Sequence, residues 1–408
     1  MIMQDNEKKP ALRFKGFTDP WEQRKLEEYL EVSGQKNFDG IYSKEDVLSV
    51  SGDFGIVNQI EFQGRSFAGA SVANYGVVET GDIVYTKSPL KSNPYGIIKA
   101  NKGKNGIVST LYAVYKPKQS ANPEFVQIYF EQDARMNNYM HPLVNKGAKN
   151  DMKVSAENAL KGQIVFPDIE EQRTISEFFR NLDTLITLHQ RKYEKLVNIK
   201  KSMLDKMFPQ NGVSVPEIRF KGFTDPWEQR KLKELYFQLT ERNADLLPYQ
   251  KTLSVATMSF KTDGNGAADT SLANYKRLRT GDIAFEGHTS KEFRYGRFVL
   301  NDVGDGIMSP RFSALRPLHE MPINFWKYYI HYEPIMRKVL VNSTKAGTMM
   351  NELVINEFLQ ESILVPSVAE QQAIGRFFKQ LDTLITLHQR KLEKLQNIKK
   401  SCLEKMFV

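Results

Sequence analysis

Basic and aromatic residues recur in turn-rich segments of this chain, where they could contact the bases or phosphates of a nucleic acid. Arginine and asparagine can bind guanine and adenine edges through two hydrogen bonds, whereas lysine more often meets a phosphate. In the first half of the chain the candidate DNA-binding residues are Lys87, Ser88, Lys91, Asn93, Tyr95, Lys99, Lys146 and Lys149. In the second half they are Arg277, Arg279, His288, Ser290, Lys291, Arg294, Tyr295, Arg297, Arg311 and Lys345. Each one taken singly is typical of a solvated surface charge, so the prediction depends on the clusters.

The composition supports an anionic partner without identifying it. Lysine and arginine number 57 against 48 acidic residues, a formal net charge of +9, and nucleic acid is the usual partner of a basic protein. The one cysteine, Cys402, excludes an intramolecular disulfide and is typical of a reducing cytoplasm. Because no long apolar run is present, we expect a soluble, unprocessed, cytoplasmic protein that contacts no membrane.

A search for catalytic motifs predicts no catalytic residue and no metal site. Gly103-Lys104 is followed by Asn105 and lacks the upstream glycine of a phosphate-binding loop. Asn93-Pro94-Tyr95 lacks the second proline of the Asn-Pro-Pro-Tyr motif of amino-methyltransferases, and no glycine-rich cofactor motif precedes it. The six histidines show no metal-ligand spacing with cysteine or acids.

Pro167-Asp168, followed by Glu170 and Glu171, could suggest a nuclease. A duplicate of this segment has Ser367 and Ala369 in place of Asp168 and Glu170. Since acidic residues stabilise the N-terminus of a helix, we predict that a helix starts here instead.

The chain repeats the same frame around two different inserts. Residues 13–26 recur without a change at 219–232, and residues 182–208 recur at 381–407 with 23 of 27 positions identical. Between these frames the two halves agree only in short segments, such as Thr80-Gly81-Asp82-Ile83 with Thr280-Gly281-Asp282-Ile283. One scaffold that presents two different binding domains is therefore predicted.

The inserts are predicted to be mixed α/β domains, which makes the chain α+β. Short apolar or aromatic runs bounded by glycine, asparagine and serine predict strands. These runs are 83–85, 107–115, 283–285 and 312–315. Helical spacing predicts helices over 124–140 and 323–340.

Residues 170–208 and 370–407 each predict one long helix, because their apolar residues recur at three- and four-residue steps. At 1.5 Å per residue such a helix is roughly 55 to 60 Å long. We predict that the two helices pair as an antiparallel coiled coil related by a pseudo-twofold axis. The alternative is two independent domains, each with its own helix. Residues predicted to pair the helices or dock a partner are Leu182, Leu185, His189, Tyr193, Leu196, Leu381, Leu384, His388, Leu392 and Leu395.

Two short motifs, together with this organisation, carry a resemblance to a known family. A Trp-Glu-Gln-Arg-Lys-Leu segment begins at Trp21 and at Trp227, and a Pro-x-x-x-Glu-Gln segment begins at Pro167 and at Pro366. With these motifs the chain resembles, over nearly its whole length, the DNA specificity subunit of type I restriction-modification systems. The resemblance implies five segments. They are a first target-recognition domain with its N-terminal segment (1–166), a first spacer helix (167–208), a linker (209–217), a second target-recognition domain (218–365) and a second spacer helix (366–408).

The same resemblance implies a non-catalytic function. Each target-recognition domain would read one half of a bipartite, asymmetric DNA site, and the helix pair would set the spacer between the halves. The helices would dock two modification (methyltransferase) subunits, and two restriction (endonuclease and translocase) subunits would join the full complex, which methylates adenine and restricts DNA. S-adenosylmethionine, ATP and magnesium would be bound by those partners and not by this chain.

Two other functions remain open from the residues alone. The two inserts could bind two different proteins, which would make the chain an interaction adaptor. Less favoured, because its motifs are missing, is a self-sufficient DNA methyltransferase.

Overall fold

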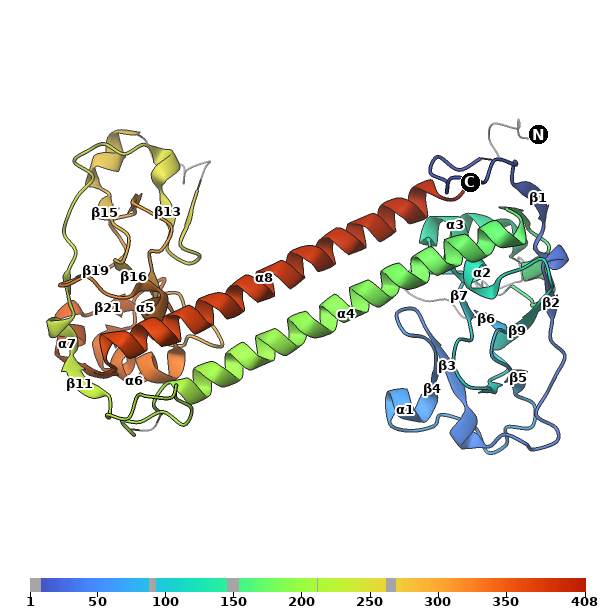
Figure 1. The fold of residues 1–408 in the computed structure, drawn as a ribbon, viewed down its shortest axis with the longest axis horizontal. Coiled ribbons are helices and arrows are strands. Elements are labelled where there is room, and N and C mark those ends of the chain that lie inside the picture. Colours follow the sequence, from blue (N-terminus) through green and yellow to red (C-terminus); the bar gives the residue numbers. More distant parts are fainter. Residues whose placement is uncertain (1–8, 88–92, 145–153, 211, 262–268) are drawn as a thin grey trace. The chain divides into compact units, whose positions relative to one another are not determined.

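The computed structural model describes residues 9–87, 93–144, 154–210, 212–261 and 269–408. The chain divides into two compact units, of which unit 1 comprises Met1–His189 and Lys391–Val408 and unit 2 comprises Gln190–Arg390. Each unit contains both helices and strands (Figure 1). The predicted α+β class is therefore confirmed.

Unit 1 is built around a four-stranded antiparallel sheet in the order β2-β9-β6-β7. Smaller antiparallel pairs, β1 with β10, β3 with β4 and β5 with β8, surround it. Its elements are β1 (Glu22–Lys25), β2 (Leu30–Val32), β3 (Leu48–Ser51), β4 (Gly55–Asn58), α1 (Gln59–Gln63), β5 (Gly76–Val78), β6 (Ile83–Thr86), β7 (Ile98–Ala100), β8 (Gly106–Val108), β9 (Tyr112–Pro117), α2 (Pro123–Tyr129), α3 (Asp133–Met140), β10 (Gln163–Phe166) and the first part of α4 (Ile169–Met207).

Successive residues of a strand point to opposite faces, and β6 buries both of its faces. Ile83 and Tyr85 join a large aromatic core with α2 and α3. Val84 joins a second cluster with Leu48 of β3 and Val114 of β9. The β3–β4 hairpin therefore covers one face of the sheet while the helices cover the other.

Unit 2 repeats this arrangement, with a four-stranded antiparallel sheet in the order β12-β19-β16-β17. Its elements are β11 (Glu228–Lys231), β12 (Tyr236–Gln238), β13 (Leu253–Ser254), β14 (Ser259–Phe260), β15 (Lys276–Leu278), β16 (Ile283–Glu286), β17 (Arg297–Leu300), β18 (Gly306–Met308), β19 (Ala314–Pro317), α5 (Ile323–Tyr329), α6 (Glu333–Ser343), β20 (Thr344–Lys345), β21 (Glu352–Leu353), α7 (Ile355–Gln360), β22 (Ser362–Val365) and the first part of α8 (Val368–Lys405).

Strands are present at the predicted runs 83–85, 283–285 and 312–315, whereas the run 107–115 is divided between β8 and β9 and each predicted helix is two shorter helices. In unit 1 the chain between α2 and α3 is extended at Gln132 (φ −82°, ψ 116°). In unit 2, Pro334 lies at the start of α6. Residues 330–332 separate α5 from α6, and Tyr332, which precedes α6, is extended (φ −74°, ψ 108°).

Each long helix contributes to the cores of both units. In unit 1, Phe407 at the end of the chain packs 5.7 Å from the ring of Phe125 and 6.2 Å from that of Trp21. In unit 2, Phe208 packs 6.0 Å from Phe325 and 6.4 Å from Trp227. Each core is thus completed by an aromatic residue from the helix of the other repeat, which excludes two independent domains with separate helices.

Within each unit the two helices run antiparallel and are joined by an equivalent ion pair. Asp183 of α4 pairs with Lys399 of α8 at 2.9 Å in unit 1, and Lys200 pairs with Asp382 at 2.6 Å in unit 2. Asp183 and Asp382 are duplicates of one another in the repeat, as are Lys200 and Lys399. The two units therefore fix the same register for the helix pair. Across the described residues, no helix combines the length and apolar character needed to cross a membrane.

Candidate nucleic-acid interface

The repeated frame segments fix the start of each long helix. Asp168 caps α4 by accepting hydrogen bonds from the backbone N–H groups of Glu170 (2.8 Å) and Glu171 (3.0 Å). The side chain of Gln172 donates to the carbonyl of Pro167 at 2.9 Å, and Gln371 repeats this bond to Pro366 at 2.9 Å. Asp168 thus caps a helix that starts after Pro167, where a helix start was predicted.

The Thr-Gly-Asp segments shared by the inserts form a tight turn before β6 and β16. Gly81 has φ +95° and Gly281 φ +94°, a conformation that favours glycine. The Asp82 carboxylate accepts from the backbone of Glu79 at 2.8 Å, and Asp282 accepts from Arg279 at 2.7 Å. The same turn therefore precedes the equivalent strands β6 and β16 in the two units.

In unit 2 the segment 344–351, which begins with β20, contacts two loops, 287–296 and 309–313, and we call these three segments the unit 2 loop cluster. Asn351 donates from its backbone to Gly287 (2.9 Å) and from its side chain to the carbonyl of Arg294 (3.1 Å). A Cβ atom on Gly287 would lie 2.1 Å from the Asn351 carbonyl oxygen, so the contact requires glycine. The Arg311 guanidinium lies 3.8 Å from the sulfur of Met349.

The unit 2 loop cluster contains seven of the ten residues predicted in this half, and an eighth, Arg297, follows it directly as the first residue of β17. Six are exposed, namely His288, Ser290, Lys291, Arg294, Arg311 and Lys345. Tyr295 and Arg297 are half-buried: the Arg294 guanidinium lies 5.9 Å from the Tyr295 ring, and that of Arg297 lies 4.9 Å from Phe293. The cluster combines exposed cations with aromatic rings, a combination suited to phosphates and bases.

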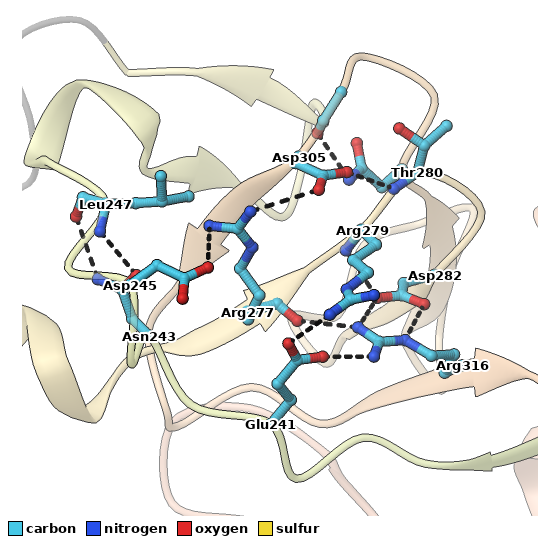
Figure 2. A network of polar contacts seen from close by, with 12 residues as sticks. Glu241, Asn243, Asp245, Leu247, Arg277, Arg279, Thr280, Asp282, Asp305 and Arg316 are labelled. Atoms are coloured by element: carbon cyan, nitrogen blue, oxygen red, sulfur yellow. Dashed lines mark hydrogen bonds and ion pairs between the residues drawn. The ribbon is translucent and has the colours of Figure 1, made fainter.

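Arg277 and Arg279 lie instead in a network of ion pairs at β15 (Figure 2). The Arg277 side chain is 14% exposed and lies 3.4 Å from Asp305 and 3.9 Å from Asp245. Arg279 pairs with Glu241 at 2.8 Å. Asp245 and Asp305 hold Arg277 against the protein, in contrast to the exposed cations of the loop cluster, whereas the Arg279 side chain is 57% exposed despite its ion pair.

Arg316 is the centre of this network, and sequence reasoning missed it. Its guanidinium donates to Asp282 at 2.8 and 2.9 Å and also to Glu241, and these bonds raise its pKa above the ordinary arginine value. Burial raises the pKa of Asp282, and the bond from Arg316 opposes that effect. The sequence could have indicated this residue, because a basic residue lies near the end of the equivalent strands β9 and β19: Lys116 in unit 1 and Arg316 in unit 2.

In unit 1 the predicted residues are less exposed. Lys87 is half-buried and donates to the carbonyl of Thr110 at 2.9 Å; burial and the nearby Lys36 lower its pKa. Asn93 is buried and donates to Asp133 at 2.7 Å. Ser88, Lys91, Lys146 and Lys149 lie outside the described residues.

Two further residues predicted in unit 1 lie close to its core. Tyr95 is half-buried, and its carbonyl accepts a 2.7 Å hydrogen bond from the hydroxyl of Tyr85. Lys99 is only 7% exposed, and burial lowers its pKa. A lysine so enclosed presents little surface to DNA.

Exposed rings at β4 and α1 were not among the predicted residues. Phe54 is 67% exposed and lies 5.2 Å from the ring of Phe62, which is 44% exposed. The Arg65 guanidinium lies 4.6 Å from the ring of Phe67. The sequence could have indicated this region, because the first insert is longer than the second near its start.

The comparisons with known proteins agree on one family. The family described as type I restriction modification DNA specificity domain matches residues 225–397. A putative type I restriction enzyme MjaX specificity subunit from Methanocaldococcus jannaschii is 21% identical over 94% of this chain and 91% of its own length. The type I restriction enzyme MjaVIII specificity subunit from the same organism is 24% identical over 58% of this chain and 59% of its own length.

This chain is therefore similar to the type I restriction-modification specificity subunits. The solved S subunit of a type I restriction-modification system from M. genitalium has the same fold, with a TM-score of 0.55, 11% identity and coverage of 98% of this chain and 99% of that one. The HsdS subunit from Thermoanaerobacter tengcongensis is similar with a TM-score of 0.45 and 15% identity, over 95% of this chain and 96% of that one. Both Methanocaldococcus relatives are named as specificity subunits, in agreement with the prediction of a non-catalytic subunit.

The long helices α4 and α8 expose the same leucines in both units. Leu185 and Leu188 are 45% and 44% exposed in unit 1, and their duplicates Leu384 and Leu387 are 43% and 44% exposed in unit 2. Of the other residues predicted to pair the helices or dock a partner, two are buried and six are half-buried. The buried ones are Leu182 and Leu381, and the half-buried ones are His189, Tyr193, Leu196, His388, Leu392 and Leu395.

Proposed function

We propose that this specificity subunit reads a bipartite, asymmetric DNA site, with one half read by each unit. The observation that carries the proposal is a duplicated frame with unlike loops. The capping contacts, the sheet order and the Thr-Gly-Asp turn recur in both units. The loops differ: the residue that follows β6 in unit 1 is Lys87, and the residue that follows β16 in unit 2 is Gly287. A shared scaffold with different loop residues supports two different half-sites.

The unit 2 loop cluster supports DNA as the ligand. Lys291, Arg294, Arg311 and Lys345 are exposed there, and cations of this kind contact phosphates with an affinity that falls as salt rises. In unit 1 we propose Lys87 and Tyr95, together with Ser88, Lys91, Lys146 and Lys149, for the corresponding contacts.

The duplicated leucine pairs support two copies of one partner. We propose that Leu185 with Leu188, and Leu384 with Leu387, each dock one modification subunit, and that α4 and α8 set the spacer between the half-sites. The complex would methylate adenine in the cytoplasm and would add two restriction subunits for cleavage. S-adenosylmethionine, ATP and magnesium would be bound by those partners.

An exchange of inserts tests the proposal. Residues 74–161 are replaced by the corresponding segment of another family member, and methylated adenines are mapped in cells that also contain the modification subunit. One half of the methylated motif should change while the other half and the assembly stay the same. The matched exchange of residues 274–360 should change the opposite half.

An unchanged motif after both exchanges would contradict the proposal. DNA binding without sequence preference, or none with the modification subunit present, would instead favour a protein-interaction adaptor.

A further inference from the structure

A small cavity, mainly apolar but with several polar residues in its lining, lies at the end of β16 beside the β13–β14 hairpin and the unit 2 loop cluster. Its volume is about 190 Å³, larger than the roughly 30 Å³ that one water occupies in the liquid. Its polar and aromatic lining is Thr252, Ser254, Lys261, Glu286, Ser309 and Phe312. The cavity can therefore admit a group larger than a single water.

Glu286 brings a buried carboxylate to this cavity. Its side chain is 7% exposed. Both hydrogen bonds that the described residues give it end on Oε1, one from the backbone N–H of His288 at 3.1 Å and one with Nδ1 of the same histidine at 2.5 Å. Oε2 is left to accept from a ligand. Because a buried charge is costly unless donors satisfy it, the cavity favours a ligand that carries N–H groups.

Thr252 provides a second observation that points to a ligand. The residue is 2% exposed, and within the described part of the chain its Oγ1 is buried without a hydrogen-bond partner. Such a group is destabilising while it stays unpaired. Thr252 and Glu286 thus bring two polar groups without a full set of partners to the lining of one cavity.

Unit 1 has the same frame at this place with different chemistry. Val47 and Thr252 occupy equivalent positions, because each forms a parallel bridge, to Ile107 and to Ile307 respectively. Glu286 is the last residue of β16. The equivalent last residue of β6 is Thr86, whose Oγ1 accepts from the backbone N–H of Ile97 at 2.8 Å. The carboxylate and the unpaired hydroxyl are thus found in unit 2 and replaced in unit 1.

We propose that Glu286 is a specificity-determining residue, and that its cavity takes the exocyclic amino group of an adenine or a cytosine in the half-site read by unit 2. This inference rests on the proposed function. In the major groove the amino groups of adenine N6 and cytosine N4 are the base donors, whereas guanine and thymine present acceptors. A carboxylate accepts from the first two bases and repels the others. The exposed cations of the adjoining loops would hold the flanking phosphates.

The first test compares the methylated motif of the wild-type complex with that of Glu286→Met, which keeps the length of the side chain and removes its hydrogen-bond acceptors. One position of the unit 2 half-site should lose its preference for adenine or cytosine, while the unit 1 half stays unchanged. Thr252→Val should weaken the same preference. Glu320→Met makes the same change at an exposed site of unit 2 and should leave the motif intact.

The second test uses the wild-type complex, so it does not depend on the folding of a variant. DNA binding is measured with purine in place of adenine, or 2-pyrimidinone in place of cytosine, at each position of the unit 2 half-site. At one position the missing amino group should weaken binding by roughly 5- to 100-fold, and the analogue that acts identifies the base. Glu286→Met, which lacks the acceptor, should bind both DNAs equally.

Undiminished binding to every analogue, or a Glu286→Met motif identical to that of the wild type, would overturn the inference and leave the cavity to water. If the wild-type complex instead binds DNA without any sequence preference, the proposed function itself is contradicted.

Discussion

The guanidinium of Arg13 holds the carboxylate of Glu171 by two hydrogen bonds, from Nε to Oε1 and from Nη2 to Oε2, each 2.7 Å long. The indole of Trp21 donates to the same carboxylate at 3.2 Å. Arg219 and Glu370 repeat the pair at 2.6 and 2.7 Å. The pair raises the pKa of Arg13. The identical frame segments are thus explained by a buried contact that ties each N-terminal segment to a helix start.

Arg13→Ala should destabilise unit 1, because the Glu171 side chain is fully buried and would lose its charged partner. Breaking a buried pair costs about 3–5 kcal/mol. Hydrogen exchange should show faster opening of 22–25 and 163–175, and Arg219→Ala should do the same for the equivalent segments of unit 2. Arg24→Ala, which removes an exposed ion pair with Glu22, is the control. Equal exchange in the Arg13 and Arg24 variants would contradict the role of the pair.

Phe407→Ala should open the core of unit 1 although residue 407 belongs to the second repeat. Phe407 is 5% exposed, and it contacts Trp21 and Phe125. Truncating a buried phenylalanine costs about 3–5 kcal/mol. Phe208→Ala is the matched variant, and its effect should fall on unit 2. Trp21 fluorescence and hydrogen exchange distinguish the two outcomes; a Phe407→Ala effect confined to unit 2 would contradict the reciprocal arrangement.

Lys99 predicts a pH dependence of stability. Burial lowers its pKa in the folded state below the ordinary value of 10.5, so between these two values the unfolded chain binds more protons than the folded one. The free energy of unfolding should therefore rise with pH in this window relative to Lys99→Met. Chemical denaturation of both proteins from neutral pH to pH 10.5 measures the difference. A difference that stays constant or falls with pH would refute the argument.

The sequence was sufficient for the elements that depend on local pattern. Ile83, Val84 and Tyr85 alternate between two cores, and such short apolar runs predict strands wherever turns bound them. The long helices were predicted from apolar residues that recur at three- and four-residue steps. Cys402 is buried in the core of unit 1, in agreement with its equivalence to Met203 in the repeat.

Contacts between distant segments could not be predicted. Phe208 and Phe407 have almost identical neighbours in sequence, so no local pattern tells which core receives which ring. Likewise Arg277 and Arg294 look alike in the sequence. Only the fold brings Asp245 and Asp305 beside Arg277 and leaves Arg294 exposed.

The exposed leucines predict the stoichiometry of the complex. Leu185→Glu with Leu188→Glu should remove one of two modification subunits, because a charge in an apolar contact is left without solvent or partner. Leu384→Glu with Leu387→Glu should remove the other, and all four changes should remove both. Native mass spectrometry counts the subunits, with Leu318→Glu, a leucine 44% exposed elsewhere in unit 2, as control. Retention of two copies in the fourfold variant would place the docking surface elsewhere.

Lys291 and Arg277 predict different consequences for DNA binding. Lys291 is exposed in the unit 2 loop cluster, so Lys291→Ala should weaken binding to all sequences and reduce the slope of log affinity against log salt by about one. Arg277 is held by Asp245 and Asp305, so Arg277→Ala should leave that slope unchanged and lower the stability of unit 2. Titrations of the complex with modification subunits at several salt concentrations, together with thermal unfolding, separate the two effects. A reduced slope for Arg277→Ala would mean that this arginine leaves its acidic partners to meet a phosphate, and a full slope for Lys291→Ala would move the DNA away from the loop cluster.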